Sequence, residues 1–429
     1  MLEWVLFFGY WIAFVAILIG YVWTLVLFVA GGRYLKIWRP APPGNEADYL
    51  WVFLVPALNE AVTITDSVTR LRNVSATNKI ILVINDGSED DTGAVLDSIA
   101  GPDLQVLTRV APNARKGKAA ALNAAFALVR EQILNQPAYA HWSPDQVVCC
   151  IVDADGRLDA AAPSMVARHF DDPIVGGVQC SVRIYNQTSY LTWMQALEFR
   201  VFGGLYQVGR SRWGTAFMGG NGQFNRMTAL ESISKAAGPW ADFLTEDQEL
   251  GLRQLAVGWW GVQEPSASVH QQGLNSLRRL YRQRTRWFQG NLQVLGESRR
   301  LYARQLYGLR RIDALMALIL PALQLIVGTA VLVALVLWIG FGIPYLPIGN
   351  IWLLLFFVQL SFGPTILGVS VIGRGKGWSG ITRVLVILVP YILYTWLLWP
   401  VVFYGLFRQL RGNSTWSKTA REAVEPPPA

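Results

Sequence analysis

The stretch Val147-Val148-Cys149-Cys150-Ile151-Val152-Asp153-Ala154-Asp155-Gly156 runs directly from an apolar segment into two aspartates. We predict a buried strand over 147–152, because the run is short, apolar and rich in branched side chains. Two carboxylates one residue apart at a strand end can approach the same divalent cation, Mg²⁺ or Mn²⁺. The same pattern also suits a turn or a helix cap, so these residues alone leave both interpretations open.

Segments of the same kind surround this stretch and alternate with helical patterns. We predict further strands over 51–55, 79–84, 104–107 and 176–182, and helices over 60–72, 91–99, 118–130 and 160–169. Such alternation is typical of an α/β fold, with a mostly parallel sheet covered by helices. Ligands bind at the carboxyl ends of the strands in that architecture.

Polar residues follow several of these strands at that edge. Asn59 and Glu60 follow the first strand and Asp86 follows the second. Asp86 could accept hydrogen bonds from a pyrimidine base, or it could cap the helix that begins near residue 91. Lys118 stands in a basic segment at a predicted helix start, where a diphosphate could bind, although a solvated basic turn fits equally well.

The composition indicates an integral membrane protein. Of 429 residues, 52% are hydrophobic and only 15% are charged, and the mean hydropathy is +0.31. The formal charge of +8 fits basic cytoplasmic loops as well as an anionic ligand. We find no nucleic-acid-binding motif, and the three cysteines have neither disulfide nor metal-site spacing.

The N-terminal segment predicts a transmembrane helix over 1–32, followed by a linker over 33–49. Residues 4–30 are long and apolar enough to cross a bilayer. Arg33, Lys36 and Arg39 follow at once, and the positive-inside rule therefore places the next domain, residues 50–275, in the cytoplasm of a plasma (inner) membrane protein.

The C-terminal part predicts transmembrane helices over 313–408, in apolar runs at 313–340, 349–372 and 384–407. Three full crossings would leave a basic tail, residues 409–429, outside the cell, against the positive-inside rule. Prolines in these runs allow broken or re-entrant helices. We therefore expect a cytoplasmic tail and leave the number of crossings open.

A basic and aromatic segment, Gln283-Arg284-Thr285-Arg286-Trp287, separates the α/β part from the apolar runs. It lies in residues 276–312, where the pattern predicts amphipathic helices at the membrane interface, with basic residues toward lipid headgroups.

Six motifs in this order resemble the membrane-integrated family 2 glycosyltransferases, which include the synthases of cellulose, chitin, hyaluronan and poly-N-acetylglucosamine. The motifs are Val55-Pro56-Ala57-Leu58-Asn59-Glu60, Asn85-Asp86-Gly87-Ser88, Gly117-Lys118-Ala119-Ala120-Ala121-Leu122-Asn123, Asp153-Ala154-Asp155, Thr245-Glu246-Asp247 and Gln283-Arg284-Thr285-Arg286-Trp287. The resemblance implies a GT-A (Rossmann-like) domain that uses a UDP-sugar.

The resemblance also implies roles for individual residues. Asp86 and Asp153 would hold the uridine part, Asp155 would hold the metal, and Asp247 would be the catalytic base, positioned by Thr245 and Glu246. Asn59, Glu60 and Lys118 would belong to the donor site. Taken alone, Asp247 is also compatible with an acid in the first turn of a helix.

The segment Gln283–Trp287 would then cover the active site. The resemblance implies that Arg286 contacts the diphosphate, while Trp287, Gln283 and Arg284 bind the acceptor sugar. Asn221 and Gln223, in a glycine-rich stretch over 217–224, offer amides to the acceptor, although a plain tight turn is an alternative. Some relatives have a cysteine in the comparable stretch and this chain has none, which leaves the acceptor open.

We therefore predict a processive, inverting, metal-dependent transferase that extends a β-linked polysaccharide, of glucose or N-acetylglucosamine, and moves it across the membrane. Its partners would be the UDP-sugar, the polysaccharide or a lipid acceptor, membrane lipids, and either an accessory export protein or further copies of the chain. One alternative is a non-processive enzyme that transfers a single sugar to a lipid. Another is a membrane scaffold built on an inactive transferase fold.

Overall fold

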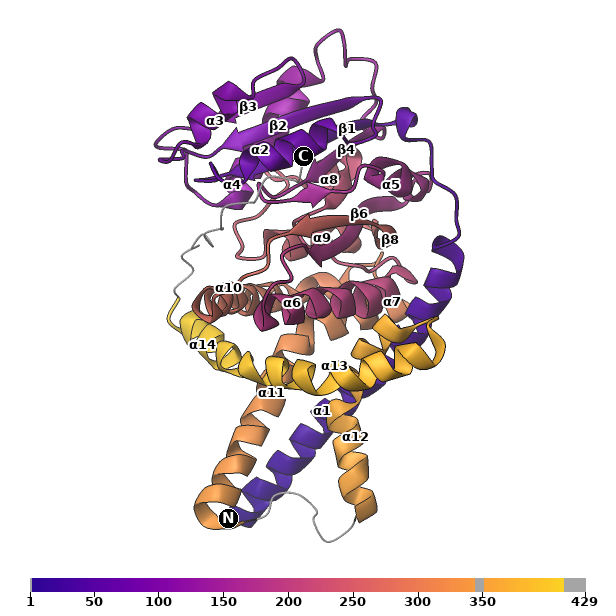
Figure 1. The fold of residues 1–429 in the computed structure, drawn as a ribbon, viewed down its shortest axis with the longest axis vertical. Helices are drawn as coiled ribbons and strands as arrows, with labels where there is room; N and C mark the ends of the chain where they lie inside the picture. The colour runs from indigo at the N-terminus through magenta and orange to yellow at the C-terminus, as the bar shows by residue number, and fades with distance from the viewer. Residues whose placement is uncertain (1, 344–350, 413–429) are drawn as a thin grey trace.

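A mixed sheet of eight strands forms the centre of the water-exposed part of the molecule (Figure 1). The computed structural model describes residues 2–343 and 351–412. The strand order is β3-β2-β1-β4-β7-β6-β8-β5. The strands are β1 (Leu50–Ala57), β2 (Lys79–Asn85), β3 (Leu104–Thr108), β4 (Val147–Ile151), β5 (Arg157–Leu158), β6 (Val175–Ile184), β7 (Gln223–Arg226) and β8 (Trp260–Gln271).

Helices cover both faces of the sheet. Side chains alternate along each strand, so the apolar strands present hydrophobic residues to both faces, and helices bury them. In β1, Trp51, Phe53 and Val55 face the core under α2 (Ile64–Arg72), α3 (Thr92–Ser98) and α5 (Ala162–Phe170). Leu50, Val52 and Leu54 face the opposite core, under α4 (Lys118–Leu128) and α8 (Met227–Ile233). A strand buried on both faces reads as a continuous apolar run, and this is why the sequence revealed it.

The five predicted strands are confirmed, but the sheet is less parallel than expected. β1 pairs in parallel with both β2 and β4, whereas β7 lies antiparallel between β4 and β6. β7 has only four residues, Gln-Phe-Asn-Arg, and gives no alternating signal. β8 contains Pro265 and many polar residues, and its pairing with β6 is irregular near that proline.

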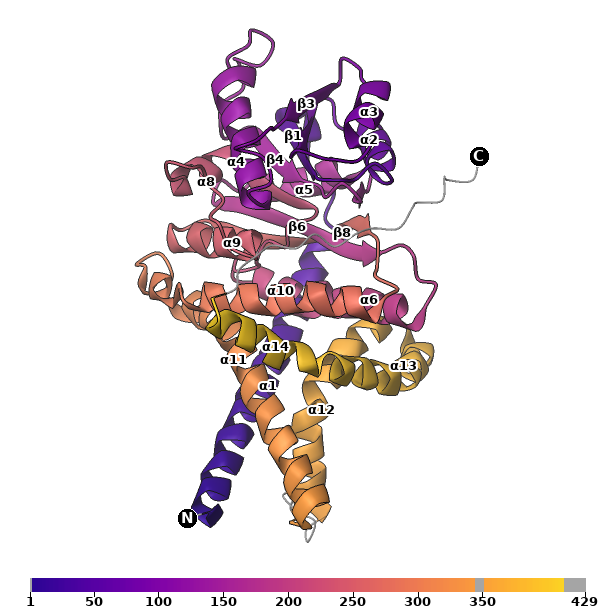
Figure 2. The ribbon, with the colours of Figure 1, turned by 90° about the vertical axis from the view of Figure 1, so that its left-hand side faces the viewer.

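A layer of helices lies between the sheet and the apolar end of the molecule (Figure 2). It contains α6 (Tyr190–Val201), α7 (Val208–Ser211), α9 (Glu246–Ala256) and α10 (Leu277–Leu295). Ser189 caps α6, because its hydroxyl accepts the Thr192 N–H while the Thr192 hydroxyl accepts the Ser189 N–H.

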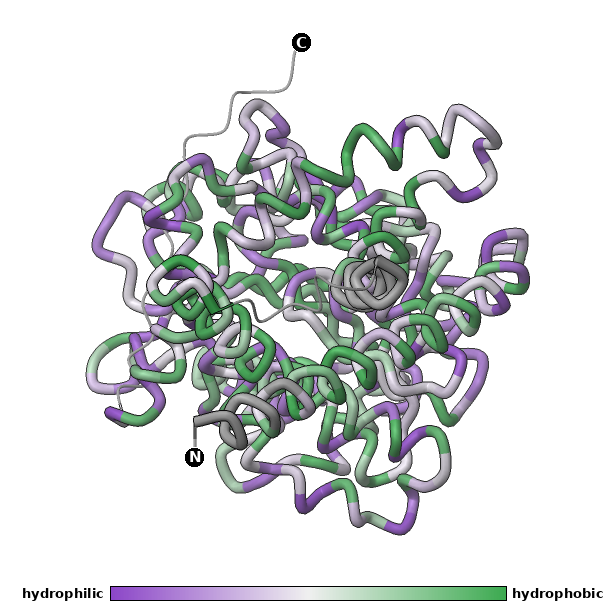
Figure 3. The backbone as a smooth tube through the Cα atoms, turned by 90° about the horizontal axis from the view of Figure 1, so that it is seen from below, coloured by the Kyte–Doolittle hydropathy of each residue, from purple (hydrophilic) through white to green (hydrophobic). Residues whose placement is uncertain are grey.

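Three apolar helices extend from the base of this layer: α1 (Leu2–Trp38), α11 (Gly308–Phe341) and α12 (Ile351–Gly373) (Figure 1). Viewed from below, many of the residues that Figure 3 colours in the helices at this end are hydrophobic. In α1 and α11, stretches of 28 and 34 residues are long and apolar enough to span a membrane. α1 continues without a break to Trp38, so the expected linker begins as helix.

The apolar run at 384–407 is two helices rather than one, α13 (Gly377–Leu397) and α14 (Trp399–Leu410). The stretch Gly377–Leu410 is apolar enough to span a membrane, but both helices lie across the base, beneath α6 and α10 (Figure 1). On α13, Ile387, Tyr391 and Tyr394 pack against α6, while Leu385 and Val389 are exposed on the outer side. This arrangement suits a helix lying in the membrane surface.

α14 lies beneath α10, which belongs to the segment expected at the lipid surface (Figure 2). The polar residues Gln283, Arg284 and Thr285 of α10 are buried against protein. The stretch between the first two C-terminal apolar runs lies largely in residues 344–350, and most of the expected cytoplasmic tail in residues 413–429; both fall outside the described residues.

Candidate active site

The parallel strands β1, β2 and β4 end at one edge of the sheet, as predicted. Their register places Ala57 beside Asn85, and Leu54 beside Ile151. The polar residues predicted at this edge therefore follow the ends of neighbouring strands. They are Asn59 and Glu60 after β1, Asp86 after β2, and Asp153 and Asp155 after β4. The first turn of α9 brings Glu246 and Asp247 to the same edge.

A lysine joins the carboxylates from these separate segments. Lys118 Nζ lies 2.6 Å from Asp153 Oδ1 and 3.9 Å from Glu246 Oε1. The charge of Asp247 also acts on this lysine. We call Asp153, Glu246 and Asp247, together with Lys118, the carboxylate cluster. Lys118 and Asp153, two of the residues predicted for the donor site, thus lie beside the predicted catalytic acids.

Burial and like charge shape the acidity of this cluster. Burial, followed by the charge of Asp247, raises the pKa of Glu246 to about 7, although Lys118 and Arg286 act in the opposite direction. Burial also raises the pKa of Asp247, against Lys118 and Arg286. Burial alone would lower the pKa of Lys118, but the charges of Asp153 and Glu246 raise it. A carboxylate with a raised pKa is a stronger base.

The glycine-rich stretch over 217–224 closes one side of the cluster. Gly220 has a φ of +80°, and a Cβ at this position would lie 2.9 Å from Asp247 Oδ2. Both the conformation and the space therefore favour glycine. The Gly220 N–H donates to Gln223 Oε1 at 3.2 Å, which holds the tight turn.

The two amides proposed for the acceptor are buried. Asn221 Oδ1 accepts the backbone N–H of Asp153 at 3.1 Å, and Asn221 Nδ2 donates to Gln271 Oε1 at 3.1 Å. Asn221 and Gln223 are only 3% and 1% exposed. In this structure they position Asp153 and the glycine turn, and a contact with an acceptor stays a prediction.

Asp155, like Asp153, follows the end of β4. It is buried, and Asp155 Oδ2 accepts the backbone N–H of Gln272 at 3.1 Å. Within residues 2–343 and 351–412, no three His, Cys, Asp or Glu side chains gather as metal ligands. Asp153 and Asp155 are oxygen donors that suit Mg²⁺ or Mn²⁺, and two carboxylates fit a site that substrate phosphates complete.

Asp86 lies on the far side of this edge, beside β3. Its Oδ1 accepts from Arg109 Nη1 at 2.5 Å and from the Arg115 N–H at 3.1 Å. Arg109 directly follows β3, so its place after a strand end could have revealed it. The sequence prediction missed this arginine.

Asn59 and Glu60 join the loops that follow β1 and β2. Asn59 Oδ1 accepts the Glu89 N–H at 2.7 Å, and the Glu60 N–H donates to Thr92 Oγ1 at 2.8 Å. These hydrogen bonds hold the two loops together, and a contact of Asn59 and Glu60 with the donor stays a prediction.

The start of α9 packs closely against α10. A Cβ at Gly290 would lie 2.7 Å from Thr245 Oγ1, and the Leu244 N–H donates to Gln293 Oε1 at 3.1 Å. The charge of Arg286 lowers the pKa of both Glu246 and Asp247. α10 thus brings Arg286 to the carboxylate cluster, while Thr245 anchors the turn that carries the acids.

Arg284, two residues before Arg286, faces another way. Its Nη2 lies 2.7 Å from Glu198 Oε2 on α6, and its guanidinium lies 4.1 Å from the centre of the Trp287 ring. Trp287 also contacts the Phe199 ring edge to face, with centroids 6.1 Å apart. Arg284 therefore joins α10 to α6 and stacks on Trp287, rather than pointing at the cluster, and Gln283 is buried beside it.

Two family models match this chain. The model of glycosyl transferase family group 2 matches residues 148–407, and that of glycosyl transferase family 2 matches residues 52–234. The first match covers more than half of the chain. Together they contain every residue of the carboxylate cluster, and α10.

Curated relatives are similar at the level of sequence. A poly-beta-1,6-N-acetyl-D-glucosamine synthase of Staphylococcus aureus (strain COL) is 29% identical over 250 residues, 57% of this chain and 55% of that protein. The probable glycosyltransferase YdaM of Bacillus subtilis (strain 168) is 29% identical over 250 residues, covering 56% and 55%. The chain spans about half the length of the curated relatives it matches.

A solved structure shares the fold along nearly the whole chain. The mannosyltransferase PcManGT from Pyrobaculum calidifontis, in complex with GDP-Man and Mn²⁺, superposes with a TM-score of 0.63 at 18% identity. The match covers 94% of this chain and 99% of that one. The likeness includes the α/β sheet and extends into the helices at the base.

Proposed function

Since this chain belongs to glycosyl transferase family group 2, we propose that it transfers a sugar from a nucleotide-sugar, at the membrane, to the hydroxyl of a growing β-linked polysaccharide. One observation carries the proposal: Asp153, Lys118, Glu246 and Asp247 converge at one sheet edge, and α10 adds Arg286. The site thus combines a base with cations for a leaving phosphate.

Asp247 acts as the general base. The acceptor hydroxyl gives its proton to a carboxylate oxygen of Asp247 while its oxygen attacks the anomeric carbon of the donor sugar. The bond from that carbon to the diphosphate oxygen breaks, and the nucleoside diphosphate leaves with the electron pair. Attack from the opposite side inverts the configuration, so an α-linked donor gives a β-linked product.

Lys118 and Arg286 stabilise the negative charge that develops on the leaving diphosphate. Asp155 and Asp153 would hold a Mg²⁺ or Mn²⁺ ion there, which supplies further charge neutralisation when bound. Gly220 leaves space beside the Asp247 carboxylate for the acceptor hydroxyl, because a side chain at position 220 would meet that carboxylate.

We place the domain of residues 50–275 on the cytoplasmic face. Arg33, Lys36 and Arg39 at the domain end of α1 support this orientation. With α1, α11 and α12 as crossings and α13 and α14 lying across the base, the chain at residue 412 stays on the same side as the domain (Figure 1). In this topology the third C-terminal apolar run does not cross the membrane, so the basic tail is no longer placed outside the cell against the positive-inside rule.

The relatives and the neighbour suggest which donors to test. The synthase of Staphylococcus aureus is named for an N-acetylglucosamine polymer, and the neighbour holds GDP-Man. Purified protein should be incubated with Mn²⁺ or Mg²⁺ and each of UDP-N-acetylglucosamine, UDP-glucose and GDP-mannose, and nucleoside diphosphate release should be measured.

We expect release with a UDP-sugar, together with a high-mass product that a linkage-specific hydrolase digests. A single-sugar lipid product would instead support the non-processive alternative. If folded protein in a membrane or in detergent released no nucleoside diphosphate with any of the donors, the result would support the inactive scaffold.

A further inference from the structure

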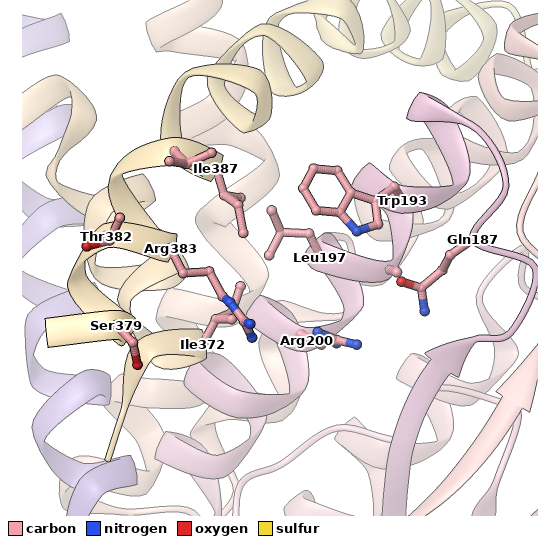
Figure 4. Close-up of a pocket in the computed structure, with 11 residues that line it drawn as sticks. Gln187, Trp193, Leu197, Arg200, Ile372, Ser379, Thr382, Arg383 and Ile387 are labelled. Atoms are coloured by element: carbon pink, nitrogen blue, oxygen red, sulfur yellow. The ribbon is translucent and has the colours of Figure 1, made fainter. Parts of the chain in front are cut away.

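A cavity of about 800 Å³ lies between α6, the end of α12 and the first turns of α13 (Figure 4). Trp193 and Leu197 of α6, and Ile372 and Ile387 of the apolar helices, form an apolar wall. A second cavity of about 290 Å³ adjoins it and shares Gln187, Ala196 and Arg200. We call the two together the arginine pocket.

Three arginines line the arginine pocket, and no aspartate or glutamate does. Arg383 of α13 and Arg200 of α6 line the larger cavity, and Arg183 of β6 lines the smaller one. Within the parts of the chain that the structure describes, none of the three forms an ion pair with a carboxylate. Burial, and then the charges of Arg183 and Arg383, lower the pKa of Arg200.

Two carboxylates beside lining residues of the arginine pocket already have partners. Glu198 of α6 accepts from Arg284 and from the Tyr394 hydroxyl, each at 2.7 Å. Asp159 accepts from the Ser268 hydroxyl at 2.6 Å and lies 3.5 Å from His270, which lines the smaller cavity. The three arginines are exposed, so solvent screens much of their mutual repulsion, but an external anion would still be attracted to three positive charges with no carboxylate among the lining residues.

The apolar wall distinguishes the kind of anion. A free phosphate needs no contact with Trp193, Leu197 or Ile387. A membrane lipid brings a phosphate and an acyl chain together. Moreover, α13 lies across the base, where lipid headgroups are located if α1, α11 and α12 cross the bilayer (Figure 1).

We propose that the arginine pocket binds the phosphate headgroup of one anionic membrane lipid, with its acyl chain along Trp193, Leu197 and Ile387. The headgroup phosphate accepts hydrogen bonds from Arg200 and Arg383, and Arg183 adds charge from the sheet side. This proposal does not depend on the proposed transfer reaction, because lipid binding is measured without a donor.

The test is native mass spectrometry of the purified full-length protein in detergent, titrated with phosphatidylglycerol or with phosphatidylcholine. We expect the first phosphatidylglycerol to bind about tenfold more tightly than phosphatidylcholine, and the double variant Arg200→Gln/Arg383→Gln to lose that preference. The double variant Arg200→Lys/Arg383→Lys should retain most of it, which also shows that the helix pair still folds.

A matched control removes the same charge elsewhere at the base. Arg299→Gln/Arg304→Gln changes two arginines between α10 and α11, with Arg304 exposed and the Arg299 side chain 81% exposed. It should leave the preference within about twofold of wild type. Equal binding of the two lipids by wild type, or an equal loss in both Gln variants, would overturn the proposal.

The source of the phosphate is decided by a soluble competitor. Glycerol 3-phosphate carries the headgroup charge without an acyl chain, so we expect it to displace phosphatidylglycerol only at concentrations about a hundredfold higher. Displacement at equal concentration would contradict the lipid assignment, since the apolar wall would then contribute nothing.

Discussion

The carboxylate cluster gathers buried and half-buried charges, whereas the arginines of the arginine pocket are exposed, and the two sites balance their charges differently. In the cluster, Lys118 lies 2.6 Å from Asp153, and Arg286 acts on Glu246 and Asp247. In the pocket, Arg200 and Arg383 stand together without a carboxylate among the lining residues. The cluster is largely neutralised from within the chain, whereas the pocket is not.

This difference separates a site for chemistry from a site for binding. A catalytic base must be present before the substrate arrives, so the protein supplies both its charge and the cations that restrain it. A binding site for an anion can leave its cations unpaired, because the ligand supplies the opposite charge. Changes to the cluster should therefore alter turnover, and changes to the pocket should alter lipid preference.

The largest effect should come from removing the base. Asp247→Asn keeps the shape of the side chain but cannot accept the acceptor proton, so we expect turnover to fall by about 10²–10⁴-fold. The measurement is nucleoside diphosphate release at saturating donor. Asp242→Asn, an exposed aspartate five residues earlier, is the matched control and should retain activity within about twofold.

If Asp247→Asn kept more than a third of wild-type turnover, Asp247 would not be the base. Nucleotide affinity should be measured in parallel, because a variant that loses donor binding instead of turnover would make Asp247 a donor-site residue.

The next effect should come from closing the space beside Asp247. Gly220→Ala forces a Cβ to 2.9 Å from Asp247 Oδ2 at a φ of +80°. We expect turnover to fall by about 10–100-fold, with a stability cost of about 1–3 kcal/mol from the strained backbone. Steady-state kinetics and thermal unfolding would measure the two effects.

Gly203→Ala is the matched control, because a Cβ there would meet no atom within 4 Å. It should leave turnover and melting temperature close to wild type. Similar losses in both variants would show that the carboxylate cluster is not sensitive to its glycine turn.

A smaller effect should appear in the dependence on pH. The pKa of Glu246 is raised to about 7 and that of Asp247 is also raised, so a proton is taken up by this pair as the pH falls below neutrality. Since the base must be unprotonated and the pKa of Asp247 is raised, kcat/KM should decline on the acid side at a pH above the range of an ordinary aspartate.

Arg286→Gln sharpens this prediction. Arg286 lowers the pKa of both acids, so its removal should shift the acid limb of the pH profile to higher pH, in addition to lowering the rate. Arg304→Gln, the removal of an exposed arginine, should leave the limb where it is. A limb that moves equally in both variants, or toward lower pH in Arg286→Gln, would contradict the placement of Arg286 beside the cluster.

The smallest effect on turnover should come from Arg284. Its ion pair with Glu198 joins α10 to α6, so Arg284→Gln should lower the free energy of unfolding by about 1–3 kcal/mol. We expect the pH limb to stay in place, in contrast to Arg286→Gln. A shift of that limb would show that Arg284 also faces the carboxylate cluster.

Much of the α/β fold could be predicted because its strands are buried on both faces. The continuous apolar runs at Val52–Val55 and Val147–Ile151 are short and rich in β-branched residues, a pattern typical of a strand that is buried on both faces. β7 and β8 could not be found this way, because polar residues such as Gln223 and Glu264 are buried in them and their partners are distant in sequence.

The candidate site was predicted in part for a similar reason. Asp153 and Asp155 follow a strand, so their place at the sheet edge is local information. Other features of the site depend on contacts between residues 35 or more positions apart. They are the pairing of Lys118 with Asp153, the hydrogen bond from the Asp153 N–H to Asn221, and the ion pair of Arg284 with Glu198. No local pattern carries those contacts.

By itself the sequence determined that the chain has an α/β part with acids at its strand ends, joined to apolar helices, because hydrophobic periodicity and strand-end polarity are local properties. Only the tertiary structure decided that the last apolar run breaks into α13 and α14 and lies across the base. It also decided that one charged site is balanced from within while another is left for an outside anion, because charge pairing depends on distance in space rather than along the chain.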